Sequence, residues 1–334
     1  MSDFPHSIAL GPTTATPELV HLYPLSIAIS TFILSVFGAI SNVIVIIAIM
    51  VSPELRNRCY FLICYLAISD LICCIYYSLL RVLIFTYRYN LTNYDCFMWS
   101  FIGLFAMNTQ TGLTVMLGVD RFLAVSQPYK YRKWHSTYYI IAMIIPPNIY
   151  AFIITGYGYI EANDQIKVPV CFPPSAYSSN SRNLWVGSNG VIIFIVLLLY
   201  FSAQHIFRKS QQTTASSSVN KMTARVLKSL MVVMIVYAGT WAFTMIMMMV
   251  ISFIVFGTPA QKVVEIFLVW PVVINASSNF IIYFWRTEEF RRATLRLFGC
   301  EKKVSNSTSV IMDKRTSTQM GSTVAVDVRR GSRW

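Results

Sequence analysis

The sequence is poor in charged residues. Only 12% of its 334 residues are Asp, Glu, Lys or Arg, whereas an ordinary soluble domain carries about 25%. Acidic residues are the scarcer kind, 14 against 27 Lys and Arg, which leaves a net charge of +13. Disorder requires low hydrophobicity, yet 55% of the chain is apolar, and a nucleic-acid-binding protein spreads its basic residues over a polar surface. Both classes are therefore excluded, and the composition indicates a membrane protein.

Cysteine and histidine are also scarce. Seven cysteines are too few for a disulfide scaffold in a chain of this length, so we expect at most one or two bridges. None of the four histidines lies in the middle of a long apolar run; they are His6, His21, His135 and His205. A zinc site inside the membrane would have no ligands. We expect neither a metal centre nor an enzyme.

Seven apolar runs are each long enough to cross a bilayer, which takes about 20 residues in a helix. In lipid only helices and closed barrels satisfy their backbone, and barrels use short alternating strands. The expected fold is therefore an all-α membrane protein with a seven-transmembrane helix bundle. The expected spans are Leu25 to Met50, Tyr60 to Phe85, Cys96 to Val125, Tyr138 to Ile160, Leu184 to Phe207, Leu227 to Phe256 and Val263 to Trp285.

Basic residues lie almost entirely on one side of these spans. That side holds 22 Lys and Arg, counting Arg121, and the other side holds 5. The positive-inside rule then places the N-terminus outside the cell and the tail in the cytoplasm. Because no basic segment and short apolar core precede a cleavage site near Met1, we expect no cleaved signal peptide. The expected parts are an extracellular N-terminus (1–24), the bundle (25–285), an amphipathic helix (286–299) and a disordered cytoplasmic tail (300–334).

The loops on the outer side carry two features of an oxidising, secretory environment. Asn90-Leu91-Thr92 is a glycosylation sequon in the first outer loop. Cys96 opens the third span and Cys171 lies in the second outer loop, so a Cys96–Cys171 bridge is the one disulfide we expect. The other cysteines near the second span are expected to be small buried residues; they are Cys59, Cys64, Cys73 and Cys74.

A carboxylate lies well inside the second span, at Asp70. A charge at the bilayer centre costs roughly 2.5–3.5 kcal/mol on insertion scales, so Asp70 needs partners. Short polar residues in other spans could surround it: Asn42, Gln110, Asn275, Ser277, Ser278 and Asn279. Two alternatives stay open. The group is either a satisfied polar cluster that holds helices together or a site for a proton or a small cation such as sodium.

An acid and a base are adjacent at Asp120-Arg121, 24 and 25 residues after Cys96. That distance is roughly 36 Å of helix, enough to reach from the outer face to the inner one. The two side chains could pair with each other or with a cytoplasmic partner.

An ordered set of motifs resembles the rhodopsin-like (class A) G-protein-coupled receptors. The matching residues are Gly38 with Asn42, Leu66 to Asp70, Cys96 with Cys171, Asp120-Arg121-Phe122, Trp241, and Asn279 to Tyr283. The segments Arg58 to Ile63 and Asp95 to Phe97 are most similar to the nematode serpentine chemoreceptors of class SX. The resemblance also has departures: Phe280, Phe243 and Ile192 stand where the family usually has proline, which puts the usual helix bends in doubt.

The resemblance implies a receptor that passes the signal of an extracellular ligand, a chemosensory small molecule or a short peptide, to a heterotrimeric G protein. In the family, the residue matching Arg121 leaves Asp120 and reaches toward tyrosines that match Tyr200 and Tyr283, and Trp241 matches a switch in the sixth helix. A plasma-membrane location, sensory neurons, and binding of arrestin and a receptor kinase at the tail are further expectations. The alternative is a seven-span transporter or channel without G-protein coupling.

The ligand is constrained by what is missing. Gly103 stands where amine receptors have an aspartate, and Val273 where opsins have their retinal-binding lysine. The resemblance therefore excludes a retinal pigment and argues against an amine. Arg81 is a base in the outer half of the second span that could meet an acidic ligand, snorkel to the interface, or pair with Glu265. Arg81, Gly103 and Trp241 are the candidate ligand contacts.

The segment after the seventh span alternates basic and apolar residues from Glu288 to Phe298. This pattern is typical of an amphipathic helix lying on an anionic inner leaflet, so membrane lipid is an expected partner. Cys300 is a candidate for palmitoylation, with an unmodified thiol as the alternative. The tail that follows is rich in Ser and Thr and suits phosphorylation.

Overall fold

The computed structural model describes residues 24–86, 91–168, 170–213, 236, 238–254, 264 and 266–299. The chain divides into two compact units, Met1–Thr294 and Leu295–Trp334. The first contains all the features described below. Of the second, the described part is the end of one helix and a turn at Gly299, whose φ of 67° suits glycine. Asn90, Glu265 and Cys300 lie outside the described residues, so glycosylation, the Arg81–Glu265 pair and palmitoylation stay predictions.

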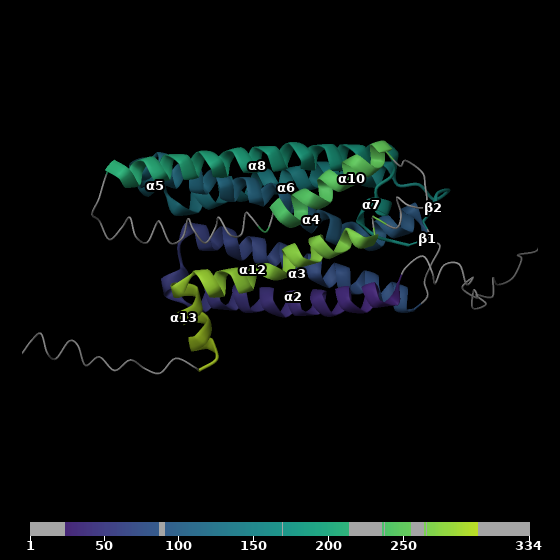
Figure 1. Cartoon of the computed structure of the whole chain (residues 1–334), viewed down its shortest axis with the longest axis horizontal. Coiled ribbons are helices and arrows are strands. Elements are labelled where there is room, and N and C mark those ends of the chain that lie inside the picture. Colours follow the sequence, from purple (N-terminus) through teal and green to yellow (C-terminus); the bar gives the residue numbers. More distant parts are fainter. Residues whose placement is uncertain are drawn as a thin grey trace, which may run out of the picture. The chain divides into compact units, whose positions relative to one another are not determined.

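The described chain is mostly helical (Figure 1). Its helices are α2 (Leu25–Val51), η1 (Pro53–Leu55), α3 (Arg58–Phe85), α4 (Asn93–Ser126), α5 (Pro128–Lys133), α6 (Ser136–Glu161), α7 (Pro173–Ala176), α8 (Ser179–Thr213), η2 (Ala238–Ala242), α10 (Phe243–Ile254), α12 (Val269–Arg286) and α13 (Glu288–Leu297). A two-residue antiparallel pair, β1 (Leu91–Thr92) with β2 (Lys167–Val168), joins the loop before α4 to the loop after α6, with Leu91 opposite Val168. The end of the helices that carries this pair is called the outer end, and the opposite end the inner end.

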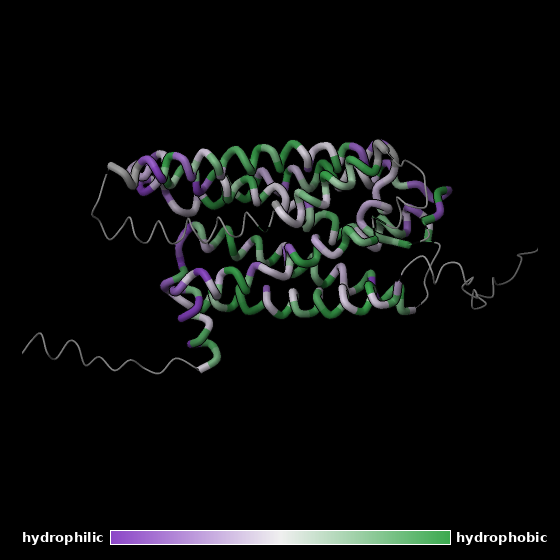
Figure 2. Tube along the Cα trace, in the orientation of Figure 1, coloured by the Kyte–Doolittle hydropathy of each residue, from purple (hydrophilic) through white to green (hydrophobic). Residues whose placement is uncertain are grey.

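Five of the described helices are long and apolar enough to cross a membrane: α2, α3, α4, α6 and α8. They coincide with the first five expected spans. The hydrophobic residues run along the helices, and hydrophilic ones gather toward their ends (Figure 2). Outward-facing side chains such as Ile102 and Phe152, 71% and 73% exposed, are apolar. Such a surface suits lipid rather than water. The last two expected spans are described only in part, as η2 with α10 and as α12.

Two helix starts are fixed by side-chain caps. The Oδ1 atom of Asn57 accepts a hydrogen bond from the Tyr60 backbone N–H at the start of α3. Thr92 does the same for Asp95 at the start of α4. Such caps satisfy amide groups that have no partner within the helix, and both lie at the ends of apolar runs.

The helix α4 is the central element of the first unit. It packs against α3, α6 and α8, while α2 packs against α3 and α12 (Figure 1). The contact with α6 is close at Gly112, where an added Cβ would lie 2.9 Å from the Cα of Pro147. α6 continues through Pro146 and Pro147, as transmembrane helices do when neighbouring groups compensate the lost hydrogen bonds.

The segment that contains Trp241 is a π-helical turn, η2, directly before Phe243. Phe243 stands where proline usually bends this helix, so the sequence left the bend in doubt. The structure has a distortion here, and its cause is the wider π turn rather than a proline. Trp241 lies within it.

Candidate functional site: an outer pocket and an inner ionic network

The predicted disulfide between Cys96 and Cys171 is present and is confirmed. It joins the first turn of α4 to the segment that leads into α7. The Asn93 side chain reinforces the link by donating hydrogen bonds of 2.9 Å to the backbone oxygens of Ser175 and Ala176. The short helix α7 is therefore held over the outer end of α4 by one covalent bond and two hydrogen bonds.

A fully buried amide, Asn108, connects four parts of the outer half of the bundle. Its Nδ2 donates to Thr155 Oγ1 on α6 at 3.0 Å and to the Tyr177 hydroxyl at 2.9 Å. Its Oδ1 accepts from the indole N–H of Trp185 on α8 at 3.1 Å. All three hydrogen bonds offset the cost of burying the Asn108 amide. Because each bond fixes a direction, they also hold Thr155, Tyr177 and Trp185 in place relative to one another.

A second asparagine, Asn189, connects α8 to the π turn. Its Oδ1 accepts from the Trp241 indole N–H at 3.2 Å, and its Nδ2 donates to the Trp185 backbone oxygen at 2.8 Å. The two indoles contact each other edge to face, with ring centroids 6.5 Å apart. Neither asparagine stood out in the sequence, because an uncharged amide in an apolar run carries little signal unless its partner is known.

A pocket opens between these indoles and the start of α12. Its empty volume is about 360 Å³, counted to its open mouth. The described residues that line it come from α3, α4, α7, α8, η2, α10 and the start of α12: Tyr77, Met107, Pro173, Pro174, Trp185, Trp241, Thr244, Met245, Met248, Leu268, Val269 and Val272.

Of the three candidate ligand contacts, the structure places only Trp241 in the wall of this pocket. The ring of Tyr76 packs directly on Gly103, where an added Cβ would lie 2.2 Å from it, so the space beside Gly103 is filled by protein. Arg81 is 1% exposed, which excludes snorkelling to the surface.

The carboxylate of Asp70 meets one of its candidate partners. Asn279 Nδ2 donates to Asp70 Oδ2 at 2.6 Å, across 209 residues of sequence. Asn42 instead donates to the backbone oxygens of Gly38 and Ala276. Asp70 Oδ1 has no hydrogen-bond partner among the described residues.

The remaining members of the expected cluster form bonds of their own. Gln110 accepts from the Cys73 thiol, and Asn275 accepts from Thr240 at 3.3 Å. The polar residues therefore make several separate links between helices, and the direct shell around Asp70 is smaller than the sequence suggested. All four cysteines of α3 are buried and free, as expected.

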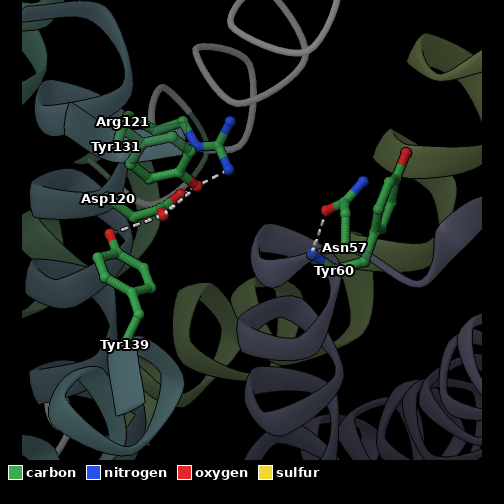
Figure 3. A network of polar contacts seen from close by, with 6 residues as sticks. All are labelled: Asn57, Tyr60, Asp120, Arg121, Tyr131 and Tyr139. Carbon is green, nitrogen blue, oxygen red and sulfur yellow. Dashed lines mark hydrogen bonds and ion pairs between the residues drawn. The ribbon is translucent and has the colours of Figure 1, made fainter. Parts of the chain in front are cut away.

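At the inner end of α4, Asp120 is buried, forms an ion pair with Arg121 and accepts hydrogen bonds from two tyrosines (Figure 3). Arg121 Nη2 lies 2.6 Å from Asp120 Oδ2, and the hydroxyls of Tyr131 and Tyr139 each donate to Oδ1 at 2.9 Å. Burial and the negative charge of Asp120 raise the pKa of Tyr131, so this hydroxyl keeps its proton at neutral pH and can act as a donor.

Arg58, at the start of α3, holds the two tyrosines from the other side. Its guanidinium donates to the backbone oxygens of Tyr131, at 2.6 Å, and of Trp134. Its central carbon also lies 5.3 Å from the Tyr131 ring centroid and 5.5 Å from that of Tyr139, within cation–π range. The ion pair is thus linked to α3, α5 and α6. Arg58 and Tyr139 were not predicted to act here.

The two tyrosines expected to receive Arg121 are buried nearby. Tyr200 is close enough to interact electrostatically with the guanidinium. Within the described part of the chain, neither Tyr200 nor Tyr283 hydrogen-bonds Arg121, and the Tyr283 hydroxyl has no partner. In this arrangement Arg121 is therefore paired with Asp120.

Comparisons with known proteins find similar sequences. A model of the family described as serpentine type 7TM GPCR chemoreceptor Srsx matches residues 35–298. The chain is 24% identical to cannabinoid receptor 1 of Xenopus laevis over 318 aligned residues, which cover 85% of this chain and 66% of that receptor. It is 26% identical to the histamine H4 receptor of Mus musculus over 181 residues, 53% of this chain and 43% of that receptor. The chain thus spans less than two thirds of the length of both relatives.

Proposed function

Because the chain belongs to the serpentine type 7TM GPCR chemoreceptor family Srsx, we propose that it passes the signal of an extracellular ligand to a heterotrimeric G protein. In this proposal η2 with α10 forms the sixth span and α12 the seventh. The N-terminus lies outside the cell, and α13 lies on the inner leaflet of the plasma membrane. The likeness to cannabinoid and histamine receptors supports the proposal.

The observation that carries the proposal is the buried ion pair at the inner end of α4. An ion pair that lies inside a protein depends on good geometry, and losing one partner costs about 3–5 kcal/mol because the other charge stays buried. A movement of helices that takes Arg121 from Asp120 therefore needs a new partner for it. The hydroxyl of Tyr283, buried and without a partner in the described chain, is available for this.

A ligand drives such a change only by binding the two arrangements with different affinity. The outer pocket contacts the π turn through Trp241, and π turns often occur at functional sites. A ligand against Trp241 would thus bias the sixth span, whose inner end faces the G protein in this fold. Arrestin and a receptor kinase at the tail, a sodium ion or proton at Asp70, and expression in sensory neurons belong to the same proposal.

The test is guanine-nucleotide exchange on a panel of purified G proteins by the full chain in lipid nanodiscs. Asp120→Asn removes the charge that holds Arg121 and keeps the side-chain size, so we expect basal exchange to rise several-fold. Arg121→Gln should abolish exchange. Arg132→Gln, on the exposed side of α5, is the matched control and should leave exchange unchanged. Background exchange in folded Asp120→Asn with every G protein, or an ion current without any G protein, would contradict the proposal.

A further inference from the structure

The wall of the outer pocket contains no charged residue among the described residues that line it. Two indoles, three methionines and aliphatic side chains make up most of it. A charged ligand that enters such a site loses its hydration and meets no opposite charge among the described lining residues. The described wall therefore disfavours both carboxylates and amines.

Three polar side chains of the wall are already bonded to groups outside the pocket. The indole N–H groups of Trp185 and Trp241 donate to Asn108 and Asn189. The Thr244 hydroxyl donates to the Thr240 backbone oxygen at 2.9 Å. Consequently these residues present mainly carbon to a ligand.

One donor in the wall has only a weak acceptor. The hydroxyl of Tyr77 donates to the thioether sulfur of Met107 at 3.3 Å, and a thioether is a poor acceptor compared with a carbonyl or ether oxygen. Tyr77 is 1% exposed, so a ligand atom reaches its hydroxyl by displacing the flexible Met107 side chain, which also lines the pocket. An oxygen atom of a ligand would be a better partner for this hydroxyl.

We propose that the pocket binds an uncharged, mainly apolar small molecule with one acceptor oxygen, which the Tyr77 hydroxyl recognises while the apolar part contacts Trp241 and the methionines. The empty space of about 360 Å³ includes the open mouth of the pocket, so part of the ligand would lie in that mouth. Pro173 and Pro174, held by the Cys96–Cys171 bridge through α7, form its outer edge. Signalling by this ligand rests on the proposed function, whereas its binding does not.

The experiment uses tryptophan fluorescence of the full chain in nanodiscs, because bromine quenches the indoles that it contacts. Four probes share a brominated ten-carbon chain and differ in the head group: 10-bromo-2-decanone, 1-bromodecane, 10-bromodecanoate and 10-bromodecylammonium. We expect saturable quenching by the ketone, weaker saturable quenching by the alkyl bromide, and only linear quenching from the membrane by the two charged probes.

Two variants and a control assign the signal to the pocket. Val269→Phe fills the pocket and should remove the saturable component. Val191→Phe, on a side chain that is 60% exposed on α8, should retain it. Tyr77→Phe keeps the ring but loses the donor, so the ketone should bind about three- to tenfold more weakly and the alkyl bromide equally well.

Tighter saturable binding of either charged probe would overturn the proposal. Linear quenching by all four probes, unchanged in Val269→Phe, would also overturn it. A phospholipid that co-purifies with the wild type and is lost in Val269→Phe would overturn it as well, because the site would then hold a lipid. Nucleotide exchange is measured in the same samples. Saturable ketone binding without nucleotide exchange on any G protein would refute the proposed function and support the ligand class. Nucleotide exchange driven only by charged ligands would refute the ligand class and support the proposed function.

Discussion

The two ends of α4 hold their neighbours by different chemistry. At the outer end a disulfide and uncharged amides, Asn93 and Asn108, fix α7, α6 and α8 in place. At the inner end an ion pair and two tyrosine hydroxyls do so. A covalent bond and a satisfied amide have one arrangement, whereas a charge can exchange one partner for another. The outer end is therefore suited to shaping a pocket and the inner end to switching.

Breaking the Cys96–Cys171 bridge at the outer end should have the largest effect on stability. Cys96→Ser removes the bridge that closes a loop of 75 residues, and loss of a native disulfide typically costs about 2–5 kcal/mol. We expect a large fall in the thermal unfolding temperature and loss of saturable ligand binding. Cys64→Ser, at a buried free thiol, is the matched control. Equal unfolding temperatures for the two variants would show that the bridge does not stabilise the outer end.

The sequence predicts the course of the chain well, because a bilayer demands long apolar helices. The first expected span, Leu25 to Met50, is the helix Leu25–Val51, and the next four agree within a few residues, apart from α8, which extends beyond its expected span at both ends. The π turn at Trp241 was not predictable, since no proline marks it and the extra residue in the turn depends on packing.

The sites were predicted where a residue is costly to bury. Asp70, Asp120 and Arg121 stand out because any charge in an apolar run needs a partner, and the structure supplies those partners. The amides of Asn108 and Asn189 and the hydroxyl of Tyr139 carry no such penalty individually. Their roles follow from the rotation of each helix about its axis, which brings donors and acceptors together from spans far apart in the sequence.

The packing around α4 provides a second test of the contrast. Gly103, in the outer half, has no room for a methyl group because the Tyr76 ring lies 2.2 Å from an added Cβ. Gly118, nearer the inner end, would meet the movable side chains of Leu199 and Tyr200 at 3.3 Å. Overpacking a tight core costs about 1–3 kcal/mol, so Gly103→Ala should lower the unfolding temperature clearly.

Gly118→Ala is the matched variant on the same helix. It gains helix propensity, roughly 1 kcal/mol, which offsets a small displacement of the two side chains, so its unfolding temperature should change little. The measurement is thermal unfolding of both variants in the same detergent, followed by tryptophan fluorescence. Equal losses of stability would mean that the inner end is packed as rigidly as the outer one.

The last comparison concerns the tyrosines that bond Asp120. Tyr139→Phe removes one donor from a buried carboxylate, and hydrogen bonds to charged groups contribute about 1.5–3 kcal/mol. Tyr131→Phe should cost less, because Tyr131 is only partly buried and water can replace its hydroxyl. If the inner network restrains Arg121, basal nucleotide exchange rises in the order wild type, Tyr131→Phe, Tyr139→Phe, double variant. Unfolding temperatures that fall in this order while exchange stays constant would assign the tyrosines to stability alone and separate them from the switch.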